Sequence, residues 1–157
     1  MSGSVYQTFG NKLRVRVCGL CVENNQLLMV NHAGITAGDF WAPPGGGLQF
    51  GETVEACLKR EFLEETGLDI EIQDLLFTCE VIRLPLHAVE MFFTTKVKHG
   101  KLMRGIDPEM EQGQIIQDVK FVPWAKIDGL NPASKHGIFS FVSGSSKILD
   151  LRGHLKL

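Results

Sequence analysis

The sequence predicts a single α/β domain, in which a mixed β-sheet carries at least one helix on a face. The chain has 157 residues, of which 44% are hydrophobic and 22% are charged, and this is enough to bury one core. Short runs rich in Val, Ile, Leu and Phe alternate with polar turns, and one helical segment follows a group of glycines. No internal repeat or linker interrupts this pattern, so we expect residues 1–157 to fold as one domain.

A hairpin is expected near the start of the chain. Residues 12–23 (KLRVRVCGLCVE) and 27–32 (LLMVNH) are strand-like, and a polar turn separates them. Cys18 and Cys21 lie in the first strand as CGLC, and this spacing sends their side chains to opposite faces of a strand. No second CxxC or Cys/His pair completes a zinc site in the sequence. We therefore predict that both cysteines are core thiols.

A helix is expected to begin near Thr53, which is suited to an N-cap, and to end near Thr66, with Gly67 as its C-terminal stop. We expect it to pack between core elements through two apolar flanks, formed by Leu58 and Phe62 and by Ala56 and Leu63.

The sequence of the second half of the chain predicts further strands, followed by a C-terminal segment with less regular structure. Strands are expected at residues 68–84, 87–100 and 118–123, with a polar loop at 101–114. Residues 133–142 are expected to form a short helix. Residues 145–157 are read as a small hairpin or a loose tail, so that 143–157 would be peripheral.

Composition restricts the class of partner. The formal net charge is −2, and nothing in this balance draws the chain to nucleic acid or to an anionic membrane. No stretch reaches the roughly 18 apolar residues that a membrane span needs. The first residues carry no secretory pattern, so we expect a cytoplasmic protein. The five histidines are scattered without metal-ligand spacing, and we expect most of them to be exposed.

Residues 43–68, PPGGGLQFGETVEACLKREFLEETGL, combine glycines with many carboxylates. At about 100° per residue, Glu61, Glu64 and Glu65 share about a third of the helix circumference. Carboxylates on one face repel each other, and a hard divalent cation with oxygen ligands removes the repulsion. The spacing therefore predicts a metal site, for which Mg²⁺ is the first choice.

The glycines at 45–47 allow close backbone approach, so that a peptide carbonyl can complete a metal shell or peptide N–H groups can meet phosphate. Glu52 and Arg60 lie eight residues apart, and Arg60 can reach Glu64 one helical turn later. We expect Arg60 to neutralise and orient the acids.

Residues 46–68 also match a known spacing. The fixed positions are Gly46, Glu52, Arg60, Glu61, Glu64, Glu65 and Gly67, with apolar residues at Phe62 and Leu68. This pattern resembles, position for position, the signature GX5EX7REUXEEXGU of the Nudix hydrolases, the MutT-like pyrophosphohydrolases, where U is a bulky apolar residue. We call residues 46–68 the Nudix box. The expected strand order around it is similar to the α/β/α sandwich with a mixed sheet of that family.

The resemblance implies hydrolysis of a nucleoside diphosphate linked to another moiety, with Mg²⁺ or Mn²⁺, by attack of water on phosphorus. It implies a set of metal ligands made of the peptide carbonyl of Gly45 and the carboxylates of Glu61, Glu64 and Glu65. Glu52 and Arg60 would orient these acids. Gly46 and Gly47 would approach the phosphates of the substrate.

A general base must take a proton from the attacking water, and its position varies within the family. The loop before the last expected strand offers Glu109, Glu111 and Asp118. We favour Glu111, and Glu61 in the box is the alternative.

The sequence is compatible with more than one class of substrate. Trp41 or Phe40 could stack on a nucleobase, although an aromatic residue before the glycines can equally serve packing. A nucleoside triphosphate and a nucleotide sugar such as ADP-ribose are both compatible with the box. The alternative function is a nucleotide-sensing protein that kept the fold and turns over poorly. The resemblance also suggests a homodimer, because members of the family often form dimers.

Overall fold

A mixed, eight-stranded sheet forms the centre of the computed structural model, which describes residues 3–105 and 116–157. Its strands are β1 (Lys12–Glu23), β2 (Gln26–His32), β3 (Trp41–Ala42), β4 (Gly45–Gly47), β5 (Leu68–Arg83), β6 (Leu86–Gly100), β7 (Ile116–Pro123) and β8 (Gly153–Lys156). The strand order is β3-β2-β1-β6-β5-β8, with β4 paired to β1 and β7 paired to β2. β1 and β6 run parallel, as do β5 and β8, and the remaining pairs are antiparallel.

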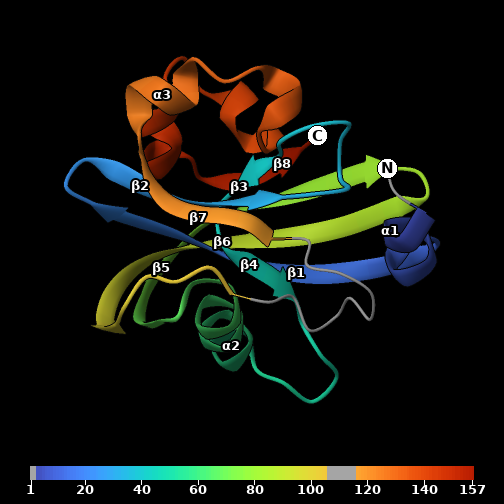
Figure 1. Cartoon of the computed structure of the whole chain (residues 1–157). Helices are drawn as coiled ribbons and strands as arrows, with labels where there is room; N and C mark the ends of the chain where they lie inside the picture. The colour runs from blue at the N-terminus through green and yellow to red at the C-terminus, as the bar shows by residue number, and fades with distance from the viewer. Residues whose placement is uncertain (1–2, 106–115) are drawn as a thin grey trace.

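Helices cover both faces of the sheet, as Figure 1 shows. The α-helices are α1 (Gly3–Phe9), α2 (Val54–Thr66) and α3 (Trp124–Asp128), and the 3₁₀ helices are η1 (Pro132–Ser134), η2 (Gly137–Phe141) and η3 (Ser145–Asp150). α2 packs on one face over a buried cluster that includes Phe62 and Ile70. α3 and the 3₁₀ helices pack on the other face over a cluster that includes Phe77 and Phe92. The predicted α/β/α sandwich with a mixed sheet is therefore confirmed.

The ends of α2 follow the prediction. The Thr53 side chain accepts a hydrogen bond from the Ala56 amide at 3.1 Å, and Gly67 ends the helix in the left-handed conformation with φ of 74°. Leu58 and Phe62 are fully buried. A Cβ on Gly19 of β1 would lie 2.5 Å from the Phe62 ring, so this glycine lets the helix approach the sheet closely.

The second apolar flank of α2 was predicted wrongly. Ala56 is exposed, and the Leu63 side chain is 61% exposed. The helix instead buries Cys57 with Leu58, so its contact face is turned away from Leu63. The acids Glu61 and Glu65 fall at the border of that face and are buried with it.

The cysteines are core thiols, as expected. Cys18 belongs to the cluster on the α3 face, and Cys21 belongs to the cluster under α2, because neighbouring side chains of a strand alternate between faces. All four cysteines are free and buried. Burial raises the pKa of Cys21 to about 11, which keeps this thiol protonated near neutrality.

The end of the chain differs from the prediction. The helix expected at 133–142 is replaced by η1 and η2, and residues 145–157 form η3 and β8 in place of a hairpin or a loose tail. A hairpin needs two antiparallel strands, whereas β8 pairs in parallel with the distant strand β5, with Phe77 opposite Gly153. The Ile148 side chain is fully buried in the core cluster, so this segment is not peripheral.

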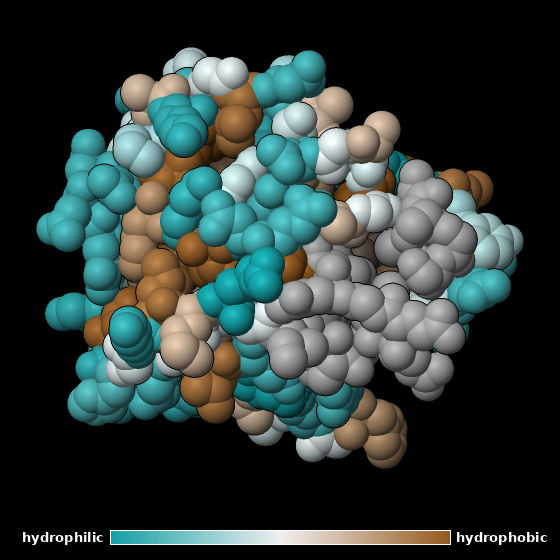
Figure 2. All heavy atoms as spheres, in the orientation of Figure 1, coloured by the Kyte–Doolittle hydropathy of each residue, from teal (hydrophilic) through white to brown (hydrophobic). Residues whose placement is uncertain are grey.

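The described part of the chain presents mainly polar side chains on the face seen in Figure 2, and apolar residues show only in small groups between them. Among the described residues, no helix has the length and apolar character needed to cross a membrane.

We expect Ile148→Ala to lower the free energy of unfolding by about 2–5 kcal/mol, because it removes a fully buried side chain and leaves a cavity. Urea denaturation measures the change. The neighbouring exposed Lys147→Ala is the control and should stay within about 0.5 kcal/mol of the parent chain. Equal, small effects in both variants would contradict the core position of η3.

Candidate active site

The glycine strand β4 lies between β1 and the acidic side of α2. A Cβ on Gly46 would come 2.3 Å from the carboxylate of Glu61, and a Cβ on Gly45 would come 2.2 Å from the carbonyl oxygen of Val17. Gly45 also has φ of 154°, which side chains rarely adopt. The glycines are therefore what allows the backbone to approach the acids so closely.

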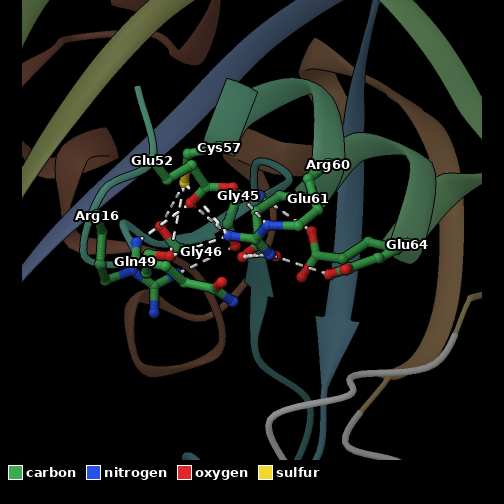
Figure 3. Close-up of polar contacts among 11 residues, drawn as sticks. Arg16, Gly45, Gly46, Gln49, Glu52, Cys57, Arg60, Glu61 and Glu64 are labelled. Atoms are coloured by element: carbon green, nitrogen blue, oxygen red, sulfur yellow. Dashed lines mark hydrogen bonds and ion pairs between the residues drawn. The ribbon is translucent and has the colours of Figure 1, made fainter. Parts of the chain in front are cut away.

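Arg60 is the centre of the polar contacts in this region (Figure 3). Its guanidinium holds Glu52 with two bonds, Nε to Oε1 at 2.7 Å and Nη2 to Oε2 at 2.9 Å. Nη1 donates to Oε1 of Glu61 at 2.7 Å and to Oε2 of Glu64 at 3.2 Å. Nη2 also donates to the carbonyl oxygen of Gly47 at 3.2 Å. One side chain thus joins three acids to the glycine strand.

These contacts set the charge state of the cluster. Hydrogen bonds from Arg60 lower the pKa of Glu52 to about 2, and the same bonds raise the pKa of Arg60 above its usual range. Glu61 is 6% exposed, whereas the side chain of Glu64 is 27% exposed. A buried carboxylate beside a more open one suits a site that faces solvent on one side.

Glu65 joins the same cluster from the next position of α2. Its Oε2 accepts the backbone N–H of Gly45 at 2.9 Å, and its side chain is buried. The carbonyl oxygen of Gly45 accepts a longer bond of 3.4 Å from Nη2 of Arg16 on β1. The four residues proposed as metal ligands therefore lie together where β4 meets α2: Gly45 bonds Glu65, and Arg60 joins Glu61 and Glu64.

Residues 11–141 match the family model described as the NUDIX domain. The chain belongs to the NUDIX hydrolase family. The match includes the whole Nudix box and extends through η2.

Two curated relatives have sequences similar to this Nudix chain. The ADP-ribose pyrophosphatase of Methanocaldococcus jannaschii is 34% identical over 95 residues, which cover 59% of the chain and 56% of the relative. The nucleoside triphosphatase NudI of an Enterobacter species is 40% identical over 62 residues, which cover 38% of the chain and 43% of the relative. The chain spans about half the length of these relatives.

Solved structures show the same fold. A MutT NUDIX hydrolase from Burkholderia pseudomallei superposes with a TM-score of 0.66, covering 88% of this chain and 97% of that one, at 20% sequence identity. At this identity the likeness concerns the fold alone.

The box carboxylates, together with the peptide carbonyl of the preceding Gly45, are oxygen donors of the kind that suits a hard divalent cation. Within residues 3–105 and 116–157, no three His, Cys, Asp or Glu side chains are already arranged around a cation position. Nη1 of Arg60 donates to one oxygen of Glu61 and to one oxygen of Glu64. A cation at the box would share those carboxylates with Arg60.

A second polar cluster lies on the other face of the sheet and was missed by the sequence analysis. Glu90 of β6 is 4% exposed, with Oε1 3.2 Å from Nε of Arg16 and Oε2 2.8 Å from Nε2 of His136. Burial opposes ionisation of Glu90, but His136 and Arg16 outweigh it and hold its pKa at about 2. The sequence feature that could have indicated this cluster is Glu90, an acid within the apolar run VEMFF.

Two histidines in this region are largely buried, although we expected most histidines to be exposed. His32 is 8% exposed, and the side chain of His136 is 13% exposed, so these two are not surface residues. Burial lowers the pKa of His32 to about 3, which keeps the ring neutral. Nδ1 of His136 accepts the Ile138 amide at 3.2 Å, which places the ring proton on Nε2, toward Glu90.

Among the described residues, Trp41 and Asp118 have their own partners outside the box cluster. Trp41 is 7% exposed and lies in the core cluster on the α3 face. Nζ of Lys120 lies over its ring, 4.7 Å from the ring centre. A substrate contact by Trp41 stays a prediction. Asp118 bonds Lys120 Nζ at 2.7 Å and the amide of Val119. Glu109 and Glu111 lie outside the described residues.

Alanine substitutions at two neighbouring glycines should have different effects on stability and on metal affinity. We expect Gly46→Ala to displace the Glu61 carboxylate, because that carboxylate is the mobile end of a side chain, and to weaken Mn²⁺ binding at least about tenfold. Its unfolding free energy should change by less than about 1 kcal/mol. Gly45→Ala meets backbone and should destabilise the chain by on the order of 1–3 kcal/mol.

Urea denaturation and Mn²⁺ titration followed by electron paramagnetic resonance measure the two effects. Full Mn²⁺ affinity in a folded Gly46→Ala variant would contradict the placement of Glu61.

Proposed function

We propose that this protein is a metal-dependent pyrophosphohydrolase, which cleaves a nucleoside diphosphate linked to another moiety by attack of water on phosphorus. The observation that carries the proposal is the set of box carboxylates held on the glycine strand by Arg60. The names of the relatives, an ADP-ribose pyrophosphatase and a nucleoside triphosphatase, support the same reaction class.

The carbonyl of Gly45 and the carboxylates of Glu61, Glu64 and Glu65 are the proposed ligands of Mg²⁺ or Mn²⁺. A cation held by these oxygens would supply positive charge to offset the negative charge of the pyrophosphate and would help to position the attacking water. Arg60 keeps Glu61 and Glu64 in place, and Glu52 in turn fixes the guanidinium plane through two bonds. The missing side chain of Gly46 leaves room for the Glu61 carboxylate, and the backbone of Gly46 and Gly47 is the proposed contact to the phosphates.

Glu111 is the proposed general base. Asp118 is less suited, because its carboxylate already pairs with Lys120, whose bond lowers the pKa of Asp118. Glu61 is also less suited, because its carboxylate is a proposed metal ligand and already accepts a 2.7 Å hydrogen bond from Nη1 of Arg60.

A Glu111→Gln variant should therefore lose at least about a hundredfold in turnover while its Mn²⁺ affinity stays unchanged. Steady-state hydrolysis assays and Mn²⁺ titration provide the two readouts. Normal turnover would pass the role to Glu61 or to Asp118.

The two relatives name two substrate classes, a nucleotide sugar and a nucleoside triphosphate, and both are small molecules. A homodimer and a cytoplasmic location remain predictions from the sequence.

The carboxylates of α2 provide a matched test of the proposed reaction. We expect Glu64→Gln to reduce Mg²⁺-dependent hydrolysis by about a hundredfold or more, because a proposed metal ligand loses its charge. Glu55→Gln removes an acid from the same helix, where Glu55 pairs with the exposed Lys59, and should leave the rate within about twofold.

Assays should cover nucleoside triphosphates, nucleotide sugars and dinucleotides, with release of phosphate products as the readout. Unchanged turnover in Glu64→Gln would refute the site. Tight binding of one nucleotide without any turnover by the parent chain would instead favour a nucleotide sensor.

A further inference from the structure

Glu90 of β6 and Arg16 of β1 form an ion pair beside the glycine strand. The two strands run parallel, and their register places these residues opposite each other. Oε1 of Glu90 lies 3.2 Å from Nε of Arg16, and Nε2 of His136 lies 2.8 Å from the other carboxylate oxygen. The buried acid is therefore contacted from β1 and from the start of η2.

The contact between Glu90 and Arg16 depends on charge more than on direction. Within the part of the chain that the structure describes, Nε of Arg16 forms no hydrogen bond, although it is buried and lies at ion-pair distance from Glu90. Burial opposes ionisation of Glu90, but His136 and Arg16 hold its pKa at about 2, so the acid is charged near neutrality. A substitution that keeps the shape of Glu90 and removes its charge would therefore release Arg16.

The Arg16 guanidinium also reaches the outer edge of β4. Its Nη2 donates to the carbonyl oxygen of Gly45 at 3.4 Å, and Glu65 accepts the N–H of the same residue at 2.9 Å (Figure 3). The ladder bond from Gly19 goes to the preceding Pro44, so the polar groups of Gly45 point away from β1. Arg16 and Glu65 thus approach this edge from the two faces of the sheet.

The box has more acids than cations at this edge. Glu52, Glu61 and Glu64 share one guanidinium, that of Arg60. Glu65 adds a fourth carboxylate through its bond to the glycine strand. A second cation in the neighbourhood is therefore attracted to the box.

Arg16 is close enough to respond to these acids. Burial disfavours its charge, but four neighbouring groups raise its pKa above the usual range, and in order of strength they are Glu90, Cys18, Glu65 and Glu61. Without the charge of Glu90, the box acids would be the strongest remaining attraction for this long and flexible side chain. A guanidinium paired with them would occupy carboxylate oxygens and repel a metal ion.

We propose that Glu90 is a positioning residue for the metal site, because its charge holds Arg16 at the carbonyl of Gly45 and keeps this cation from the box carboxylates. The inference deepens the proposed function and rests on it, since those carboxylates are the proposed metal ligands. It gives a role in metal binding to a residue on the α3 face of the sheet, outside the Nudix box.

Glu90→Gln keeps the shape of the side chain and removes its charge. We expect this variant to bind Mn²⁺ at least about tenfold more weakly than the parent chain in a titration followed by electron paramagnetic resonance, because Arg16 turns to the box acids. The matched control Glu80→Gln removes another sheet acid that contacts a histidine, His87, and should change the affinity less than about twofold.

Removal of Arg16 in the same background distinguishes positioning from folding. The double variant Arg16→Met/Glu90→Gln has no cation to release, so it should bind Mn²⁺ at least about fivefold more tightly than Glu90→Gln. If Glu90 served folding alone, the loss of a second side chain would not restore affinity. Urea denaturation shows whether each variant is folded. Glu90→Asp keeps the charge on a shorter side chain, and the same comparison with Arg16→Met applies to it if Glu90→Gln does not fold.

Kinetics with Mg²⁺ separate this inference from the proposed reaction. The half-saturating Mg²⁺ concentration of Glu90→Gln should rise about tenfold, and high Mg²⁺ should recover most of the lost turnover. Parent affinity for Mn²⁺ in Glu90→Gln, or no recovery in the double variant, would overturn the positioning role while hydrolysis stands. If the parent chain hydrolyses nothing but the Mn²⁺ affinities change as expected, the reaction falls and the positioning role stands.

Discussion

The guanidinium of Arg60 is the interaction on which the site depends. It is bonded to Glu52, Glu61 and Glu64 and to the carbonyl of Gly47, so it neutralises acids that would otherwise repel each other at the surface of α2. The same bonds tie α2 to the glycine strand. Such forked, charge-assisted bonds have fixed directions, so they determine where the carboxylates point.

Two further contacts, one from α2 and one from β1, hold Gly45 of the glycine strand. Glu65 accepts the N–H of Gly45 from α2, and Arg16 donates to the carbonyl of the same residue from β1. Glu90 forms an ion pair with Arg16, and His136, the N-cap of η2, contacts the other oxygen of Glu90. The buried C-terminal segments thus support the site through a chain of contacts across the sheet, although they lie far from the box in sequence.

The sequence predicted the parts of this arrangement that are local. Thr53, Gly67 and the spacing of the box acids depend on helix periodicity and capping, and residues of one helix can be read from one stretch of sequence. The cross-sheet group of Arg16, Glu90 and His136 depends on strand register, which no short window contains. The parallel pairing of β8 with β5 is non-local in the same way, and for that reason the end of the chain was wrongly read as a hairpin or tail.

The most direct measurement is a titration of the ¹⁵N-labelled full chain with Mn²⁺, followed by paramagnetic broadening of its amide resonances. We expect the amides of β4 and of the half of α2 that carries Glu61 and Glu64 to broaden first. It would be contradicted if broadening began instead at the surface group of Glu80, His87 and His154, while the amides of β4 and α2 stayed sharp.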